Sequence, residues 1–267
     1  MHDDDMIGRI GYVDVSAEDP TVVIKVSDKP VLDIGRPGMF DDNGVTPASL
    51  VDHDGRLYLF YVGWQLGVKV RYYLFPGVAV SDDGGNTFSR VSEAPILDRV
   101  SGQEYMRTAP SVIKVGGVFI MWFVAGGEWI ELEGKMVPKY NMYSMQSSHP
   151  VVWPKGPGYS CLDKHYDNEF GYGRPQVIAE DGIYKMFYSI RYRDIGYRLG
   201  YAESSNAYMF ARKDSMMNID VSDSGWDSES LSFSSIVDYK DKRYMFYNGS
   251  HGGRTGVGVA VMNGRSM

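Results

Sequence analysis

The feature that most constrains the fold is an aromatic segment that recurs four times, each time after a polar turn. Tyr, Phe, Met and Trp dominate it, and these residues fill the pleated, half-buried surface of a β-strand. The copies start about sixty residues apart, which is the scale of a β-propeller blade and not of a helical solenoid. The four copies are Gly55–Gly63, Gly117–Gly126, Gly182–Ile190 and Lys242–Gly249.

Two shorter strand-like segments flank each aromatic segment, and we name them the first and third strands of the repeat. The predicted first strands are Val45–Val51, Thr108–Ile113, Arg174–Ile178 and Leu231–Val237. The predicted third strands are Val78–Ser81, Tyr140–Met145, Leu199–Glu203 and Val257–Met262. One further copy of the third strand, Ile10–Ser16, stands alone. The pattern predicts an all-β, five-bladed β-propeller with an incomplete first blade at the N-terminus.

The repeats predict a single propeller domain over residues 1–267. Its parts are a partial first blade at 1–40 and four repeats at 41–105, 106–168, 169–226 and 227–267. An open ring exposes strand edges and part of its core. We therefore expect that roughly forty residues of the first blade precede Met1, judged from the repeat length. The alternative is a genuine partial blade, closed by a partner or left open. If residues are missing, we expect Ile10, Tyr12 and the neighbouring blade to expose apolar surface and the chain to aggregate or dimerise, so that an oligomer covers the incomplete blade.

Composition limits the class of partner. The net charge of −7 and the pI near 5.3 argue against nucleic acid, which requires a basic face. No apolar stretch is long enough for a membrane-spanning helix. One cysteine, Cys161, excludes an internal disulfide and suits a reducing compartment, so we expect a cytoplasmic protein. The histidines show no metal-ligand spacing, and we expect neither a metal nor a cofactor.

The segment Ser81–Phe88 matches the Asp-box pattern, Ser-x-Asp-x-Gly-x-Thr followed by an aromatic residue. Its side chains close a hairpin by hydrogen-bonding backbone groups, so Asp83 is predicted to be a turn residue and not a catalyst. A degenerate copy follows at Ala202–Phe210. Asp boxes are common in propellers that act on carbohydrates.

Candidate catalytic residues lie where each first strand begins. When the repeats are aligned on Pro47, Pro110, Pro175 and Ser234, an acid precedes each of these positions by five or six residues. Equivalent positions in a radial array meet near the axis, and facing carboxylates can divide into one protonated and one ionised group, as glycoside hydrolysis requires. The alternative is a ring of solvated carboxylates neutralised by the neighbouring Arg107 and Arg174. The four acids are Asp42, Glu104, Glu169 and Glu229.

Candidate substrate-binding residues lie near the same rim. Trp64, Trp129 and Tyr188 could stack on sugar rings, although each could equally pack at a strand end. His251 and Arg254 occupy the turn after the last aromatic segment and could border the pocket.

The chain resembles a known family. Five segments are similar to those of bacterial five-bladed propeller proteins in the arabinanase, levansucrase and invertase superfamily, the family-43-like glycosidases, in the subgroup encoded among surface-polysaccharide genes. They are Phe40–Pro47, Gly171–Pro175, Trp226–Glu229, Arg243–Gly249 and Gly253–Ala260. The resemblance implies a base Asp from the first blade, a second Asp from the next and an acid Glu from the third. The first has no counterpart here. Asp42 matches the second by position, and the acid could be Glu104 or Glu169.

Together these observations favour a glycoside hydrolase-like enzyme that acts on a bacterial polysaccharide or oligosaccharide through axial carboxylates. A non-catalytic carbohydrate-binding or scaffold propeller is the main alternative. A phosphorylase or transferase is the third, because Arg107, Arg174 and Arg254 could hold a phosphate in place of water.

Overall fold

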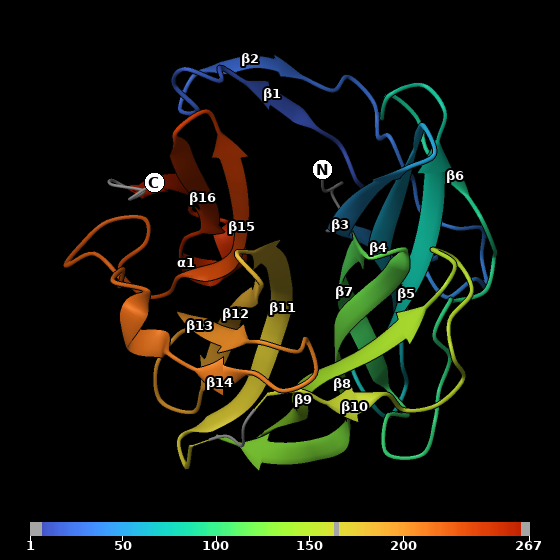
Figure 1. Cartoon of the computed structure of the whole chain (residues 1–267). Coiled ribbons are helices and arrows are strands. Elements are labelled where there is room, and N and C mark those ends of the chain that lie inside the picture. The colour runs from blue at the N-terminus through green and yellow to red at the C-terminus, as the bar shows by residue number, and fades with distance from the viewer. Residues whose placement is uncertain (1–6, 163–165, 263–267) are drawn as a thin grey trace. The chain divides into compact units, whose positions relative to one another are not determined.

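The computed structural model describes residues 7–162 and 166–262, and nearly all of their regular structure is β (Figure 1). The chain divides into two compact units. The first comprises Val26–Cys161 with the N-terminal segment up to Val13, and the second comprises Leu162–Met267 with Asp14–Lys25. No helix among the described residues is long and apolar enough to span a bilayer.

The first unit contains the first two predicted repeats as antiparallel meanders. The first repeat consists of β3 (Val45–His53), β4 (Arg56–Leu66), β5 (Tyr72–Ser81) and the short β6 (Ser89–Arg90). The second consists of β7 (Met106–Val115), β8 (Val118–Leu132), β9 (Lys135–Ser147) and the short β10 (Tyr159–Ser160). Every strand predicted for these repeats is confirmed. The short outer strands were not predicted, because two residues carry no readable alternation.

The second unit contains the other two repeats. The third consists of β11 (Glu169–Glu180), β12 (Ile183–Tyr192), β13 (Arg198–Ser204) and β14 (Ala211–Arg212), and a 3₁₀ turn, η1, at Asp214–Met216 follows it. The fourth consists of β15 (Ser232–Tyr239), β16 (Lys242–Asn248) and β17 (Val257–Met262), with one helical turn, α1 (Ser250–Gly253), between the last two strands. The strands predicted here are also confirmed, and the five-bladed ring that would join all the repeats stays a prediction.

The N-terminal segment differs in part from the expected lone strand at Ile10–Ser16. Only β1 (Val13–Val15) is a strand there, and it pairs with an unpredicted partner, β2 (Val23–Val26). Ile10 instead forms an isolated bridge with Leu32 and joins the apolar core of the first unit. Both β1 and β2 are largely exposed.

A tyrosine and a glycine explain why the middle and third strands of a repeat lie so close. The ring of Tyr61 on β4 covers Gly77 on β5, where a Cβ atom would come within 2.3 Å of the ring. Tyr188 on β12 covers Gly200 on β13 in the same way, at 2.6 Å. The glycine is required because any side chain would displace the aromatic residue that fills the blade.

Each first strand contains a β-bulge near its beginning. The pairing register shifts between Pro47 and Ser49 in β3, and at the corresponding places in β7, β11 and β15. In the last three strands the bulge holds a non-glycine residue at positive φ, which is uncommon and concentrates at functional sites. These residues are Ala109 at 49°, Arg174 at 41° and Phe233 at 57°.

The strand registers correct the alignment of the repeats. Because Thr46, Thr108, Gly173 and Ser232 all pair with equivalent residues of the middle strands, Pro47 corresponds to Arg174 and not to Pro175. Asp42, Glu104 and Glu169 therefore share one position, five residues before the bulge residue. In the fourth repeat Ser228 occupies this position, and Glu229 is the next residue.

Candidate functional site

Glu169 is the most firmly held of the candidate acids. Arg212, on the unpredicted strand β14, grips it with two hydrogen bonds, from Nη1 to Oε2 at 2.7 Å and from Nη2 to Oε1 at 2.8 Å. The hydroxyl of Tyr172 and the backbone N–H of Tyr166 also donate to Oε2, at 2.8 and 3.1 Å. Both side chains of the ion pair are buried, so this is a desolvated, two-point salt bridge.

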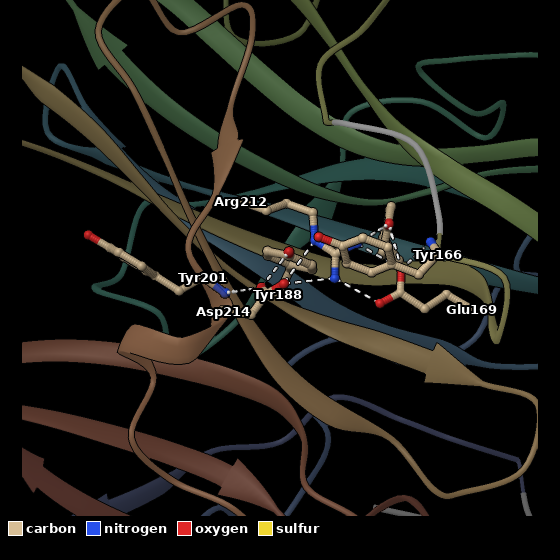
Figure 2. Close-up of polar contacts among 7 residues, drawn as sticks. Tyr166, Glu169, Tyr188, Tyr201, Arg212 and Asp214 are labelled. Atoms are coloured by element: carbon tan, nitrogen blue, oxygen red, sulfur yellow. Dashed lines mark hydrogen bonds and ion pairs between the residues drawn. The ribbon is translucent and has the colours of Figure 1, made fainter.

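Asp214 completes the cluster on the other side of Arg212 (Figure 2). Its Oδ2 lies 2.7 Å from Nη2 of Arg212, and its Oδ1 accepts hydrogen bonds from the hydroxyl of Tyr188 at 2.7 Å and the N–H of Tyr201 at 2.9 Å. Arg212 thus lies between two carboxylates, and a tyrosine hydroxyl donates to each of them. The cluster is well satisfied and binds the outer strand β14 to the body of its blade.

The cluster determines the protonation state of Glu169. Burial acts to raise the pKa of Glu169, but the hydrogen bonds from Arg212, Tyr166 and Tyr172 outweigh it, so the pKa lies below its ordinary value. The pKa of Arg212 is raised: burial opposes the rise, and the hydrogen bond to Glu169 leads the effects that outweigh it. Glu169 is consequently ionised at neutral pH. A proton donor needs the opposite shift, and the contacts of Glu169 favour a structural role.

Tyr188 is not available to stack on a sugar, contrary to the sequence-based expectation. It is fully buried, its ring covers Gly200, and its hydroxyl donates to Asp214. Burial and the nearby Asp214 carboxylate raise the pKa of Tyr188. Its repeat equivalent, Tyr61, has the same role in the first unit.

Asp42 is half-buried and accepts a hydrogen bond from the N–H of Gly38 at 2.8 Å, so one of its oxygens closes the loop that precedes β3. Its neighbour Asp41, which sequence reasoning missed, is fully buried. Asp41 accepts hydrogen bonds from the hydroxyl of Tyr61 at 3.0 Å and from Nε of Arg90 at 2.8 Å, whereas its other oxygen is buried without a partner. The sequence signal that could have found Asp41 is an aromatic residue followed directly by Asp, which occurs at the same position in two of the repeats.

That aromatic-Asp pair recurs in the last repeat. Phe40 stacks on Tyr61 with ring centroids 6.0 Å apart, and Trp226 stacks on Tyr247 at 5.6 Å. Asp227, which follows Trp226, accepts a hydrogen bond from the hydroxyl of Tyr247 at 3.2 Å. The two repeats use one device to anchor the segment that carries the candidate acid.

Glu104 and Glu229 are exposed and form no ion pair with Lys or Arg among the described residues. One oxygen of Glu104 accepts the N–H of Gly102 at 2.7 Å. Glu229 lies 3.4 Å from Nε2 of His251, which the α1 turn presents at a positive φ of 55°. The structure thus brings together Glu229 and His251, two residues that the sequence assigned to one rim.

Arg107 is buried, contrary to the expectation that it contacts substrate. It donates to the backbone carbonyls of Asp98 and Gly156, both at 2.9 Å, and its guanidinium lies over the ring of Phe123. Burial lowers the pKa of Arg107 to about 10, so the group stays charged at neutral pH while it holds two loops. Arg174 and Arg254 differ, because neither makes an ion pair among the described residues, and Arg254 is exposed.

Trp64 and Trp129 are half-buried and belong to one aromatic cluster of the first unit. The ring of Tyr72 lies 5.3 Å from that of Trp64 and 6.0 Å from that of Trp129, and Tyr105 adds a further contact to Trp129 at 5.0 Å. The indole N–H of Trp64 donates to Thr46 at 3.2 Å, whereas that of Trp129 is buried without a partner. The cluster offers partly exposed aromatic surface beside the beginning of β3.

The remaining local expectations concern turns and metals. Asp83 accepts hydrogen bonds from the hydroxyls of Ser81 and Thr87 and from the Thr87 N–H, so its predicted turn role is confirmed. Asn206 caps the degenerate copy of the motif in the same way. Within residues 7–162 and 166–262, no group of three or more His, Cys, Asp or Glu side chains is arranged to hold a metal ion.

Comparison with known proteins places these residues in context. No protein-family model matches the chain. The sequence is 32% identical over 253 residues to a protein of Mycobacterium tuberculosis described as uncharacterized protein Rv1502, and the match covers 95% of this chain and 83% of that protein.

Solved structures show the same fold at low sequence identity. A structure of the BT0996 RGII complex matches with a TM-score of 0.69 at 19% identity, over 90% of this protein and 75% of that one. An endo-arabinase from Bacteroides thetaiotaomicron matches at 0.63 and 15%, over 91% and 82%. A thermostable family-43 glycoside hydrolase matches at 0.65 and 14%, over 83% and 72%. This chain is therefore similar in fold to these glycosidases.

Proposed function

This chain belongs to the same family as the Mycobacterium tuberculosis protein Rv1502, and we propose that it is a glycan-processing enzyme of the glycoside hydrolase type. The observation that carries the proposal is the placement of the acids on a glycosidase fold. Three of them share one position before the bulge of a first strand, and the fourth lies one residue away. Bulges adjoin active sites because they re-aim side chains.

The contacts of the acids divide their proposed roles. Glu169 is neutralised by Arg212, so it orders the blade and does not exchange protons. Glu229, paired with His251, is the proposed proton donor to the glycosidic oxygen, and it regains a proton from solvent water through His251. Asp42 and Glu104 are the proposed catalytic acids of the first unit, from their place before the bulge of a first strand. Trp64 and Trp129 are the proposed stacking surface for sugar rings.

A carbohydrate-binding propeller without catalysis is the second candidate. It is favoured by the state of Glu169, because the acid matched by its Gly-Arg-Pro surroundings is held in a salt bridge. A blade whose acid serves only to hold a neighbouring strand can still present aromatic and polar groups to a glycan.

Product release from a panel of bacterial oligosaccharides, followed with the parent and with Glu229→Gln, Asp42→Asn and Glu104→Gln, tests the proposal. Asp241→Asn, in the exposed turn between β15 and β16, is the matched control. We expect turnover by the parent and the control and a loss of at least about a hundredfold in Glu229→Gln. Sugar binding without turnover in the parent would instead identify a binding module.

A further inference from the structure

We propose that Arg174 binds an anionic substituent of the glycan, which makes the substrate an acidic sugar. This inference rests on the proposed function above and adds the chemical class of the ligand. The argument begins with the backbone, because Arg174 lies at the bulge of β11 with a φ of 41°. Ala109 and Phe233 have the same conformation at the same position, so the fold imposes the strain. A charged side chain is the distinguishing feature of Arg174.

The guanidinium of Arg174 has no counter-ion within the described part of the chain. It makes no hydrogen bond or ion pair there, although it is half-buried. Burial alone shifts its pKa, downward, and no carboxylate offsets that effect. A charge that is partly withdrawn from water and lacks a counter-ion is unfavourable, so pairing it with an anionic ligand would stabilise it.

The nearest acid in sequence cannot cancel this charge. Glu169 lies five residues upstream on the same strand. Both of its oxygens already accept hydrogen bonds, from Arg212, Tyr172 and the N–H of Tyr166. Arg107 differs, since both of its terminal nitrogens donate to backbone carbonyls. Within residues 7–162 and 166–262, the donors of Arg174 have no protein partner.

A second observation comes from the neighbouring first strand, β15. The hydroxyls of Ser232 and Ser234 are both buried and both without a hydrogen-bond partner. They flank Phe233, whose ring lies 3.8 Å from where a Cβ atom on Gly173 would stand. Gln176 ties the strands together by donating to the carbonyl of Ile236 at 3.0 Å and accepting its N–H at 2.5 Å.

The guanidinium of Arg174 suits an oxyanion. It presents two parallel N–H groups that match the oxygens of a carboxylate, sulfate or phosphate ester. A neutral hydroxyl of a sugar would leave the positive charge uncompensated. The chemistry therefore selects a uronic acid or a sugar ester of a strong acid over a neutral sugar.

The test compares acidic sugars with their neutral parents by calorimetry: glucose, galactose and mannose, the 6-phosphates of these three sugars, and glucuronate, galacturonate and mannuronate. The variants are Arg174→Gln and Arg174→Lys, with Arg56→Gln, an exposed arginine paired with Asp82, as the control. We expect at least one acidic sugar to bind the parent at least about tenfold more tightly than its neutral parent. Arg174→Gln should abolish that preference, Arg174→Lys should retain part of it, and the control should retain all of it.

Two further measurements separate the outcomes. Thermal unfolding of Arg174→Gln without ligand should show an unchanged or raised Tm, since an unpaired charge is removed. A Tm that falls by several degrees would overturn the proposal in favour of a structural arginine. Absence of any acidic preference in the parent would also overturn it, as would an Arg174-dependent affinity for inorganic phosphate alone, which would mark a phosphate co-substrate. Because binding is measured without turnover, a failed hydrolase assay leaves this result intact.

Discussion

Glu169 and Arg212 face each other as a two-point ion pair, with 2.7 and 2.8 Å between the guanidinium nitrogens and the two carboxylate oxygens. One partner begins β11 and the other lies on the short outer strand β14. A bidentate pair fixes both distance and orientation, so it determines how the outer strand lies on its blade. Because of this pair, Glu169 has a structural role, although the sequence made it a candidate catalytic acid.

Replacing Glu169 by Gln should therefore destabilise the protein. The buried guanidinium would keep Asp214 but lose its principal partner, and breaking such a pair costs on the order of 3 kcal/mol. Urea denaturation measures the free energy of unfolding. Glu18→Gln, which removes an exposed pair with Lys240, is the control and should cost less than about 1 kcal/mol. An unchanged stability of Glu169→Gln, together with lost turnover, would return Glu169 to a catalytic role.

The strands of the repeats could be predicted from the sequence, whereas most of the side-chain contacts between the strands could not. The aromatic period located all the middle strands, because alternation over seven or more residues is readable along the chain. Arg212 was missed because a two-residue strand has no pattern, and its partner lies 43 residues away. Tyr188 was misjudged because the glycine that its ring covers lies on another strand. Such pairings are fixed by tertiary packing.

The alignment of the repeats shows the same limit. Proline marks the first strands in the sequence, but Pro47 occupies the bulge position itself, whereas Pro110 follows the bulge residue Ala109. A bulge changes the count by one residue, and a single sequence does not reveal where it falls. The correction strengthens the site hypothesis, since it brings Asp42, Glu104 and Glu169 into one register.

Acid should destabilise the third and fourth repeats. The hydrogen bonds from Lys185 and then Arg243 lower the pKa of Glu180 to about 2. Because the folded pKa lies below the ordinary value of 4.5, the stabilisation is fully present above that value and is lost as the pH falls toward 2. We expect the free energy of unfolding to fall over this range, and to fall less in Glu180→Gln. Equal slopes for the parent and the variant would contradict the assignment.

Gly77→Ala should test the packing of tyrosine on glycine. The added methyl group would lie within 2.3 Å of the Tyr61 ring, and overpacking of this kind costs about 1–3 kcal/mol. Gly156→Ala is the control, because nothing lies within 4 Å of the Cβ position there. Thermal unfolding should show a lower Tm for the first variant alone. Equal values for the two would mean that the ring moves aside freely.

The β1–β2 hairpin should promote self-association. Val23 and Ile24 are 57% and 68% exposed and point to opposite faces of β2, so neither face of the strand is covered. We expect Val23→Lys/Ile24→Lys to reduce the apparent mass in light scattering at high concentration. Val68→Lys, a fully exposed loop position, is the control and should leave the mass unchanged. A parent protein that stays monomeric at all concentrations would refute this prediction.

Glu229 and His251 should act as one unit. Their side chains are 3.4 Å apart, both are exposed, and the tight turn of α1 fixes the imidazole beside the carboxylate. If the pair donates a proton to the glycosidic oxygen, each single change to Gln removes the same proton path, so the double variant should be little slower than Glu229→Gln alone.

The measurement is kcat/KM of the two single variants and the double variant on one substrate, with His149→Gln as the control for an exposed histidine elsewhere in the chain. His251→Gln should also change the pH dependence of kcat/KM, which a merely structural histidine would leave in place. Additive losses in the double variant, with an unaltered pH profile, would show that the two residues act separately, and the proton donor would then have to be sought at Glu104 or Asp42.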